Sequence, residues 1–94
     1  MKKAMDALIR FRDTRDWKPY HTPENLAKSI AIEAGELLEH YQWGVEPNLD
    51  DVKDEIADVL AYALMLCEAY GYDPESIVLS KIKKNALKYP KIKR

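Results

Sequence analysis

The stretch IEAGELLEHYQW, residues 32–43, contains no proline and places Leu37 and Tyr41 four residues apart. This spacing predicts a helix, because apolar residues three and four apart share one helix face. Glu33 interrupts the pattern, since on a helical wheel it lies almost in line with Leu26 and Leu37. A carboxylate beside a stripe that should be buried needs a compensating partner or a function.

Glycines and prolines divide the remaining chain into helical segments. Thr22 and Asp73 are the expected N-caps of two helices, because each precedes a proline that suits the first helical position. Gly44 and Gly71 stand where helix C-caps would lie. The expected helices are Lys3–Thr14, Pro23 to about Trp43, a third one capped by Asn48 or Asp50 and ending near Tyr70, and Pro74 to about Tyr89. No alternating strand pattern occurs, so the predicted fold is all-α, with four helices in a single domain, 1–94.

The third helix predicts self-association. Its segment VLAYALMLC, residues 59–67, is apolar on every side, and a helix of that kind is buried on every side. Four short helices cannot easily enclose it, and below about 100 residues a single core is marginal. We therefore expect oligomerisation, as a homodimer or homotetramer, to complete the bundle. The alternative is a central helix wrapped by the other three.

Composition narrows the class of protein. The chain has 94 residues, 47% of them hydrophobic, and a net charge of −1, which argues against binding to nucleic-acid polymers or membranes. Cys67 is the only cysteine, so an internal disulfide is excluded. The sequence shows no signal peptide and no apolar run long enough to cross a bilayer, and a cytoplasmic protein is expected. The C-terminal segment alone is strongly basic, through Lys81, Lys83, Lys84, Lys88, Lys91, Lys93 and Arg94.

Two pairs of acids explain the carboxylate at position 33. Glu33 and Glu36 project from neighbouring turns of one helix face, and Glu55 and Asp58 repeat this spacing on the next helix. Helices joined by a short loop pack side by side in antiparallel fashion, so the four carboxylates can converge. Converging carboxylates favour a cation, and Mg²⁺ suits them because this ion prefers oxygen ligands and bridges carboxylates to phosphates. The alternative is that both pairs are surface acids without a ligand, since glutamates three residues apart are common on helices. Mn²⁺ is a possible substitute.

Other acids on these helices have simpler interpretations. Glu39 points away from the apolar stripe, while Asp51 and Asp54 lie in a first helical turn, where acids complement the helix dipole. A di-iron site would need Glu-x-x-His pairs, which are absent. His40 receives no role. The chain also lacks a phosphate-binding glycine loop and a nucleophile elbow.

The motifs together resemble a known family. RDWKPYHTPENLAKSIAIEAGELLEHYQW, followed by DEIADVLAYALMLCEAYGYDPESIVLSKIKKNALKYP, is similar to the MazG-like all-α nucleotide pyrophosphohydrolases, and within them to the dCTP pyrophosphatase group. The resemblance covers about Arg15 to Pro90. It implies a helical protomer that forms dimers or dimers of dimers. It also implies Mg²⁺-dependent hydrolysis of nucleoside triphosphates to a monophosphate and pyrophosphate.

The resemblance assigns roles to individual residues. It implies that Glu33, Glu36, Glu55 and Asp58 bind metal, that Lys81 and Asn85 contact phosphate and nucleotide, and that Trp17, His21, Asn25, Trp43 and Tyr62 lie near the base and sugar. Glu24 departs from the pattern, because relatives usually carry a basic residue there. Apart from the resemblance, the favoured interpretation of Trp17 is an anchor for the connector, residues 15–21, and that of Trp43 is a cover for the core.

The expected mechanism is metal-assisted hydrolysis, with Glu36 as the acid that orients the attacking water. Two alternatives remain open at this stage. The first is a non-catalytic helical assembly module whose acids bind a structural ion or none. The second is a pyrophosphohydrolase that acts on a phosphoribosyl nucleotide of histidine biosynthesis. The sequence does not reveal the preferred base.

Overall fold

The computed structural model describes residues 1–92, and every regular element in that range is helical. The elements are α1 (Lys2–Thr14), the short 3₁₀ helix η1 (Lys18–Tyr20), α2 (Pro23–Glu39), α3 (Leu49–Tyr70) and α4 (Pro74–Lys88). The predicted all-α class with four helices is therefore confirmed. Two members of the basic C-terminal segment, Lys93 and Arg94, lie outside the described residues.

The expected caps begin α2 and α4. The hydroxyl of Thr22 accepts a hydrogen bond from the N–H of Asn25, at 3.2 Å. The carboxylate of Asp73 accepts one from the N–H of Ser76, at 2.8 Å. Each bond satisfies one of the main-chain donors that the first turn of a helix leaves without a partner.

Residues close to each end of α3 explain where this helix begins and ends. Of the two candidate caps, Asn48 is the one used, since its side-chain oxygen accepts from the N–H groups of Asp50 and Asp51. At the other end Gly71 adopts φ 72°, a left-handed conformation that glycine reaches without strain. The N–H of Tyr72 then bonds back to the carbonyl of Cys67 at 2.9 Å, which closes the helix.

The predicted end of α2 near Trp43 is wrong by one turn. The helix ends at Glu39, and the following residues form tighter turns, in which the N–H of Tyr41 bonds to the carbonyl of Leu38 at 3.0 Å. Such i to i−3 bonds are typical of an unwinding helix end. Gly44 completes the reversal with φ 67°.

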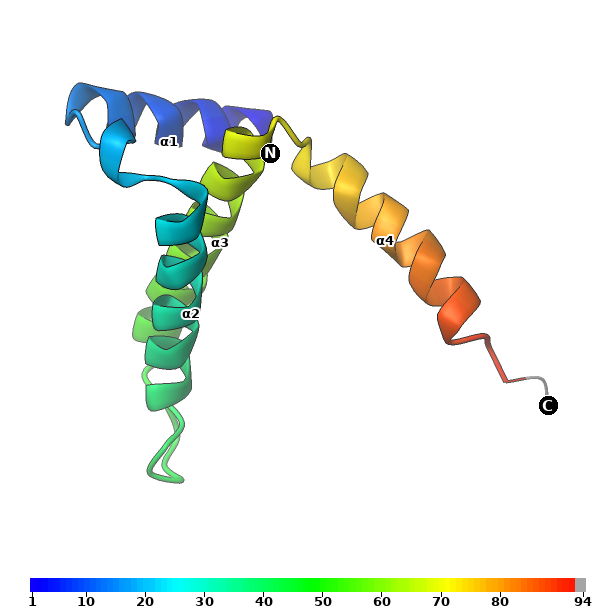
Figure 1. Cartoon of the computed structure of the whole chain (residues 1–94). Coiled ribbons are helices and arrows are strands. Elements are labelled where there is room, and N and C mark those ends of the chain that lie inside the picture. Colours follow the sequence, from blue (N-terminus) through cyan, green and yellow to red (C-terminus); the bar gives the residue numbers. More distant parts are fainter. Residues whose placement is uncertain (93–94) are drawn as a thin grey trace.

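The packing of the chain is uneven. In Figure 1, α2 lies alongside α3, and α1 crosses the C-terminal end of α3. By contrast, α4 points away from the other three helices. The buried apolar residues of the described chain all belong to α2 and α3: Leu26, Val52, Leu64 and Met65. The alternative of a third helix wrapped by the other three is therefore wrong for the single chain, because α4 does not close over α3.

The protomer is open for its size. Its Cα radius of gyration is 16.3 Å, compared with about 12 Å expected for a compact chain of this length. Its accessible surface of 7875 Å² exceeds by roughly 2,300 Å² the area typical of a folded monomer of this mass. No helix among the described residues is long and apolar enough to span a membrane.

Candidate active site

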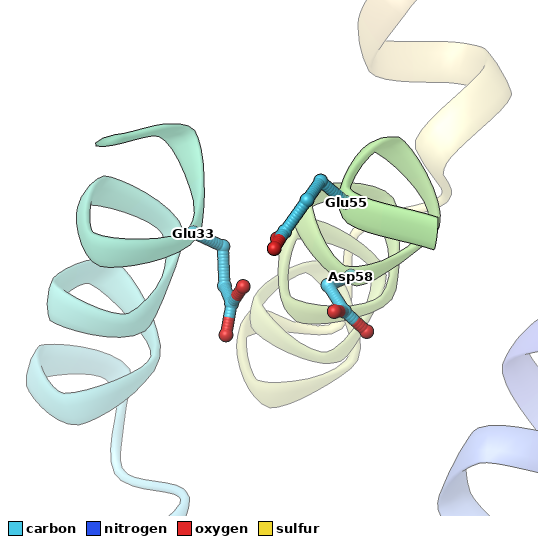
Figure 2. A group of neighbouring side chains, drawn as sticks. All are labelled: Glu33, Glu55 and Asp58. Atoms are coloured by element: carbon cyan, nitrogen blue, oxygen red, sulfur yellow. The ribbon is translucent and has the colours of Figure 1, made fainter. Parts of the chain in front are cut away.

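Three of the four predicted metal-binding acids converge between α2 and α3. Glu33 of α2 and Glu55 and Asp58 of α3 each offer a carboxylate oxygen, and these oxygens lie within 4.8 Å of one another. In Figure 2 the side chains of Glu33 and Glu55 point into the space between the two helices, while the Asp58 carboxylate is turned away from α2. The three-residue spacing puts Glu55 and Asp58 on neighbouring turns of α3, with Glu55 half-buried and Asp58 exposed at the edge of the cluster.

Burial makes this cluster electrostatically unfavourable when it stands alone. Burial, followed by the neighbouring carboxyl groups of Glu36, Glu55 and Asp58, raises the pKa of Glu33 to about 7. Glu33 Oε2 and Glu55 Oε2 are buried and have no hydrogen-bond partner. A buried oxygen without a partner gives up its hydrogen bonds to water and gains none in exchange, which costs free energy. A hard cation bound to these oxygens would offset that cost, so the donor set fits such an ion.

Glu36 and His40 border the three acids. Glu36 lies one turn after Glu33, is half-buried, and is not part of the 4.8 Å group. His40 follows the last turn of α2, and its Nε2 lies 3.8 Å from Glu55 Oε1. His40 is thus the only basic side chain paired with any of these acids among residues 1–92, a contact that the sequence analysis did not assign.

Aromatic side chains line the region between the connector and α3. Trp17 and His21 have ring centroids 6.2 Å apart, and His21 and Tyr62 are separated by 6.4 Å. Phe11 of α1 extends the row, with its centroid 5.6 Å from that of Trp17. We call these four residues the aromatic row. It contains three of the side chains predicted to lie near the base: Trp17, His21 and Tyr62.

Tyr62 connects the aromatic row with the acids. Burial raises the pKa of its hydroxyl, and the charges of Glu33, Asp58 and Glu36 raise it further. Asp58 and Tyr62 are also four residues apart on α3 and share one of its faces, so the acids adjoin the ring that forms the end of the row. The acids and the aromatic row constitute one continuous candidate site along α3.

Two predicted nucleotide contacts have different surroundings. The side-chain amide of Asn25 donates to the carbonyl of Tyr20 at 3.0 Å and so closes the connector onto the start of α2. Trp43 is 79% exposed in the turn after α2. It therefore does not cover the core, and no described contact joins it to the aromatic row.

Lys81 and Asn85 are separated from the acids within one chain. Both lie on α4, which leaves the other helices beyond Gly71 (Figure 1), and both are exposed. The single chain brings together three acids and three aromatic residues, but it does not bring these two polar groups to them. This separation is the main difference between the predicted and the observed site.

The sequence analysis also missed Arg12. This residue is only 5% exposed, and its guanidinium contacts Asp13 and Glu68. Its position supplied a signal, because Arg12 follows Met5, Leu8 and Ile9 on the apolar stripe of α1. The same argument that singled out Glu33, a charge beside a buried stripe, applies to it.

Comparison with known proteins supports one family. A family model described as MazG-like family matches residues 28–94. Among curated proteins, the chain is similar to dCTP pyrophosphatase 1 from Homo sapiens, at 34% identity over 90 residues, and to that from Mus musculus, at 33%. The matches cover 85% of this chain and 53% of those proteins, so the chain spans about half the length of the curated relatives it matches.

A solved structure resembles the whole protomer. It is the crystal structure of a pyrophosphatase from Archaeoglobus fulgidus DSM 4304, with a TM-score of 0.86 and 44% sequence identity. The match covers 97% of this chain and 93% of that one. The open arrangement with a projecting last helix therefore belongs to a shared fold.

Proposed function

Since the chain belongs to the MazG-like family, we propose that it hydrolyses nucleoside triphosphates, in particular deoxynucleotides, to a monophosphate and pyrophosphate. The observation that carries this proposal is the convergence of Glu33, Glu55 and Asp58 with two buried carboxylate oxygens that have no partner. A role in removing unwanted nucleotides from the cellular pool is consistent with this reaction. We further propose that residues 1–94 act as one catalytic domain.

We propose that Glu33, Glu36, Glu55 and Asp58 hold the metal, with Mg²⁺ the best candidate and Mn²⁺ an alternative. When bound, the ion supplies positive charge that stabilises the developing charge on the phosphoryl oxygens. The acids themselves fix where the phosphate chain can lie. Glu36 stands outside the group of three oxygens, which suits it to accept a proton from water and to orient that water for attack.

The aromatic row provides a place for the base. Trp17, His21 and Tyr62 offer ring faces for stacking, and His21 Nδ1 is a buried polar atom without a hydrogen-bond partner. A base edge that bonded this atom would remove its desolvation cost. Asn25 shapes this end of the site through the connector, and we assign Trp43 a role at its outer rim.

A second copy of the chain is needed to bring Lys81 and Asn85 to the site. On α4, Val78, Ile82 and Ala86 form an exposed apolar stripe, and Lys81 and Asn85 each precede one of its members. Burying the stripe against another protomer would therefore place these two polar groups at the border of the contact.

Surface area and charge both favour this assembly. The roughly 2,300 Å² of excess surface is of the size that obligate interfaces bury. α4 carries four lysines, at 81, 83, 84 and 88, against one glutamate, Glu75, and the acidic cluster is complementary to it. We propose a homodimer or homotetramer in which α4 of one protomer completes the site of its partner.

The direct test is an assay of canonical and modified deoxynucleotides with Mg²⁺ or Mn²⁺, in which pyrophosphate and orthophosphate are measured separately. We expect metal-dependent release of pyrophosphate from at least one substrate, and loss of release in Glu36→Gln. Release of orthophosphate instead would contradict the proposed bond cleavage.

Two other functions can be separated by the same assay. A non-catalytic assembly module would show no turnover on any substrate. A pyrophosphohydrolase for phosphoribosyl nucleotides would prefer a nucleotide with an additional ribosyl phosphate over free triphosphates. The aromatic row favours the free nucleotide, because it offers stacking surface for one base close to the acids.

A further inference from the structure

Arg12 links the end of α1, and the connector that follows it, to α3. The proposed function needs these two parts in a fixed relative position. Its Nη1 donates to Glu68 Oε2 at 3.1 Å, which fixes the C-terminal end of α1 to α3. Its Nε and Nη2 both contact Asp13 Oδ1, at 2.9 and 2.8 Å. A guanidinium so deeply buried is strongly held, because its charge is compensated by hydrogen-bonded contacts with two carboxylates.

The main chain of Arg12 holds the connector that carries the aromatic row. Its carbonyl accepts hydrogen bonds from the N–H of Arg15 at 3.2 Å and from the N–H of Trp17 at 3.1 Å. Asp16, between them, adopts φ 54°, so the chain reverses direction at this point. The position of the Trp17 backbone is thus tied to one residue that is itself fixed to α3.

The side chain of Arg12 also influences His21 electrostatically. Burial lowers the pKa of His21, and the charge of Arg12 lowers it further. The titratable or charged groups that face His21 are Arg12 from α1 and Tyr62 from α3. His21 therefore stays neutral at neutral pH, with one ring nitrogen able to donate and the other able to accept a hydrogen bond.

We propose that Arg12 is a positioning residue for base selection, which holds Trp17 and His21 in place against Tyr62. This inference rests on the proposed nucleotide hydrolysis and extends it to a residue outside the site. The function of the arrangement is to present a neutral, preorganised imidazole to one edge of the base.

The test compares Arg12→Gln with Arg12→Lys and with a control, Arg10→Gln. Glutamine keeps an amide donor for Glu68 but removes the charge, lysine restores the charge, and Arg10 is exposed on the same helix. Titration of the His21 imidazole by NMR in the nucleotide-free protein should show a raised pKa in Arg12→Gln. The titration should return toward wild type in Arg12→Lys and remain unchanged in Arg10→Gln.

Nucleotide selection provides the second measurement. In Arg12→Gln the ratio of kcat/KM between the preferred and a disfavoured base should fall about five- to tenfold, the value of roughly one hydrogen bond. This loss should begin at higher pH than in wild type, since the imidazole becomes protonated earlier. An Arg12→Gln protein with unchanged His21 titration and unchanged base ratio would overturn the proposal.

Glu68→Gln keeps the proposal testable if Arg12→Gln does not fold. This variant retains the buried charge but weakens its link to α3, so base selection should decline while the pKa of His21 stays lowered. A wild-type base ratio in Glu68→Gln would refute the positioning role. Failure of the proposed function looks different, because the wild-type protein would then release no pyrophosphate while the coupling of Arg12 to His21 would still appear by NMR.

Discussion

The α2–α3 pair and α4 bury very different fractions of their apolar side chains. Leu26, in the first turn of α2, is 2% exposed, whereas Ile82 on α4 is 56% exposed although both are large aliphatic residues on a regular helix. The pair also carries the acids, while α4 carries the lysines. Because α4 has good caps and an apolar stripe but no surface in its own chain to pack on, it fits the proposal that a second protomer supplies that surface.

This difference assigns distinct tasks to the two regions. The pair positions the clustered acids by its own packing, so a single chain can preorganise them. In the proposed assembly, α4 positions Lys81 and Asn85 only after another protomer has provided a contact surface. The two regions are therefore expected to respond differently to substitution, dilution and pH.

The largest expected effect comes from substitutions at opposite ends of the site. Glu36→Gln should reduce turnover by about two orders of magnitude or more, the usual contribution of a positioned acid–base group. Lys81→Ala should reduce kcat/KM by about ten- to a hundredfold, because a charge-assisted hydrogen bond to phosphate is lost. Initial rates of pyrophosphate release measure both.

Mixing the two impaired variants tests whether α4 acts across subunits. If Glu36 and Lys81 of one site come from different protomers, a mixed dimer contains one intact site. Random re-association of equal amounts should then restore about a quarter of wild-type activity. No recovery after verified subunit exchange would mean that each chain supplies its own α4.

The apolar stripe of α4 offers the next test of the comparison. Ile82→Asp should convert the oligomer into a monomer or strongly weaken it, because a charge would be buried in the proposed interface. Leu87→Asp is a matched control, since Leu87 lies on another face of the same helix and is 86% exposed. Light scattering at micromolar concentration should distinguish the two variants. If the wild-type protein is a well-folded monomer, the proposed interface does not exist.

Local sequence signals predicted most of the fold because they act within a few residues. The caps at Thr22 and Asp73 and the left-handed glycine at position 71 set the helix boundaries that the structure contains. The end of α2 was harder to predict, because the helix unwinds through tighter turns before it reaches Gly44. No single residue marks that point.

The candidate site was predictable where helix periodicity determines it. The spacing of Glu33 with Glu36, and of Glu55 with Asp58, was sufficient to place acids between two antiparallel helices. The direction in which α4 leaves the pair was not predictable from spacing, since it depends on a short turn and on a surface outside the chain. The position of Arg12 on the apolar stripe of α1 signalled its burial, but spacing could not reveal its partner Glu68, which is 56 residues away.

The pH dependence of stability should identify the acidic cluster. The pKa of Glu33 is raised to about 7 from an ordinary value of 4.5. Between these values the unfolded chain loses a proton that the folded chain keeps, so stability should decrease as pH rises from about 4.5 to 7 and then level off. The loss amounts to at most about 3 kcal/mol.

Denaturant unfolding in EDTA across this pH range measures the effect. Glu33→Gln should flatten the curve, whereas the exposed acid substitution Glu39→Gln should leave it unchanged. Millimolar Mg²⁺ should raise stability most at the high-pH end, since it binds only the folded, ionised cluster. Identical curves for wild type and Glu33→Gln would show that the Glu33 carboxyl does not cause the pH dependence of stability.

The smallest expected effect concerns Glu24, where relatives usually carry a basic residue. Glu24 lies in the first turn of α2, is exposed, and pairs with Lys28 at 3.2 Å. It is nine residues from Glu33, which along a helix corresponds to about 14 Å, so it stands away from the acids. If the phosphate chain depends on α4 of the partner rather than on this position, Glu24→Lys should change kcat/KM by less than about threefold.

Glu24→Lys should also cost roughly 0.3–1 kcal/mol of stability, because a positive charge opposes the helix dipole at its start. Steady-state kinetics and a thermal melt measure the two quantities, with Lys28→Gln as the control that breaks the same pair without adding a positive charge. A gain of tenfold or more in kcat/KM would instead place a phosphate contact at the start of α2. The phosphate chain would then not depend on α4 of the partner alone.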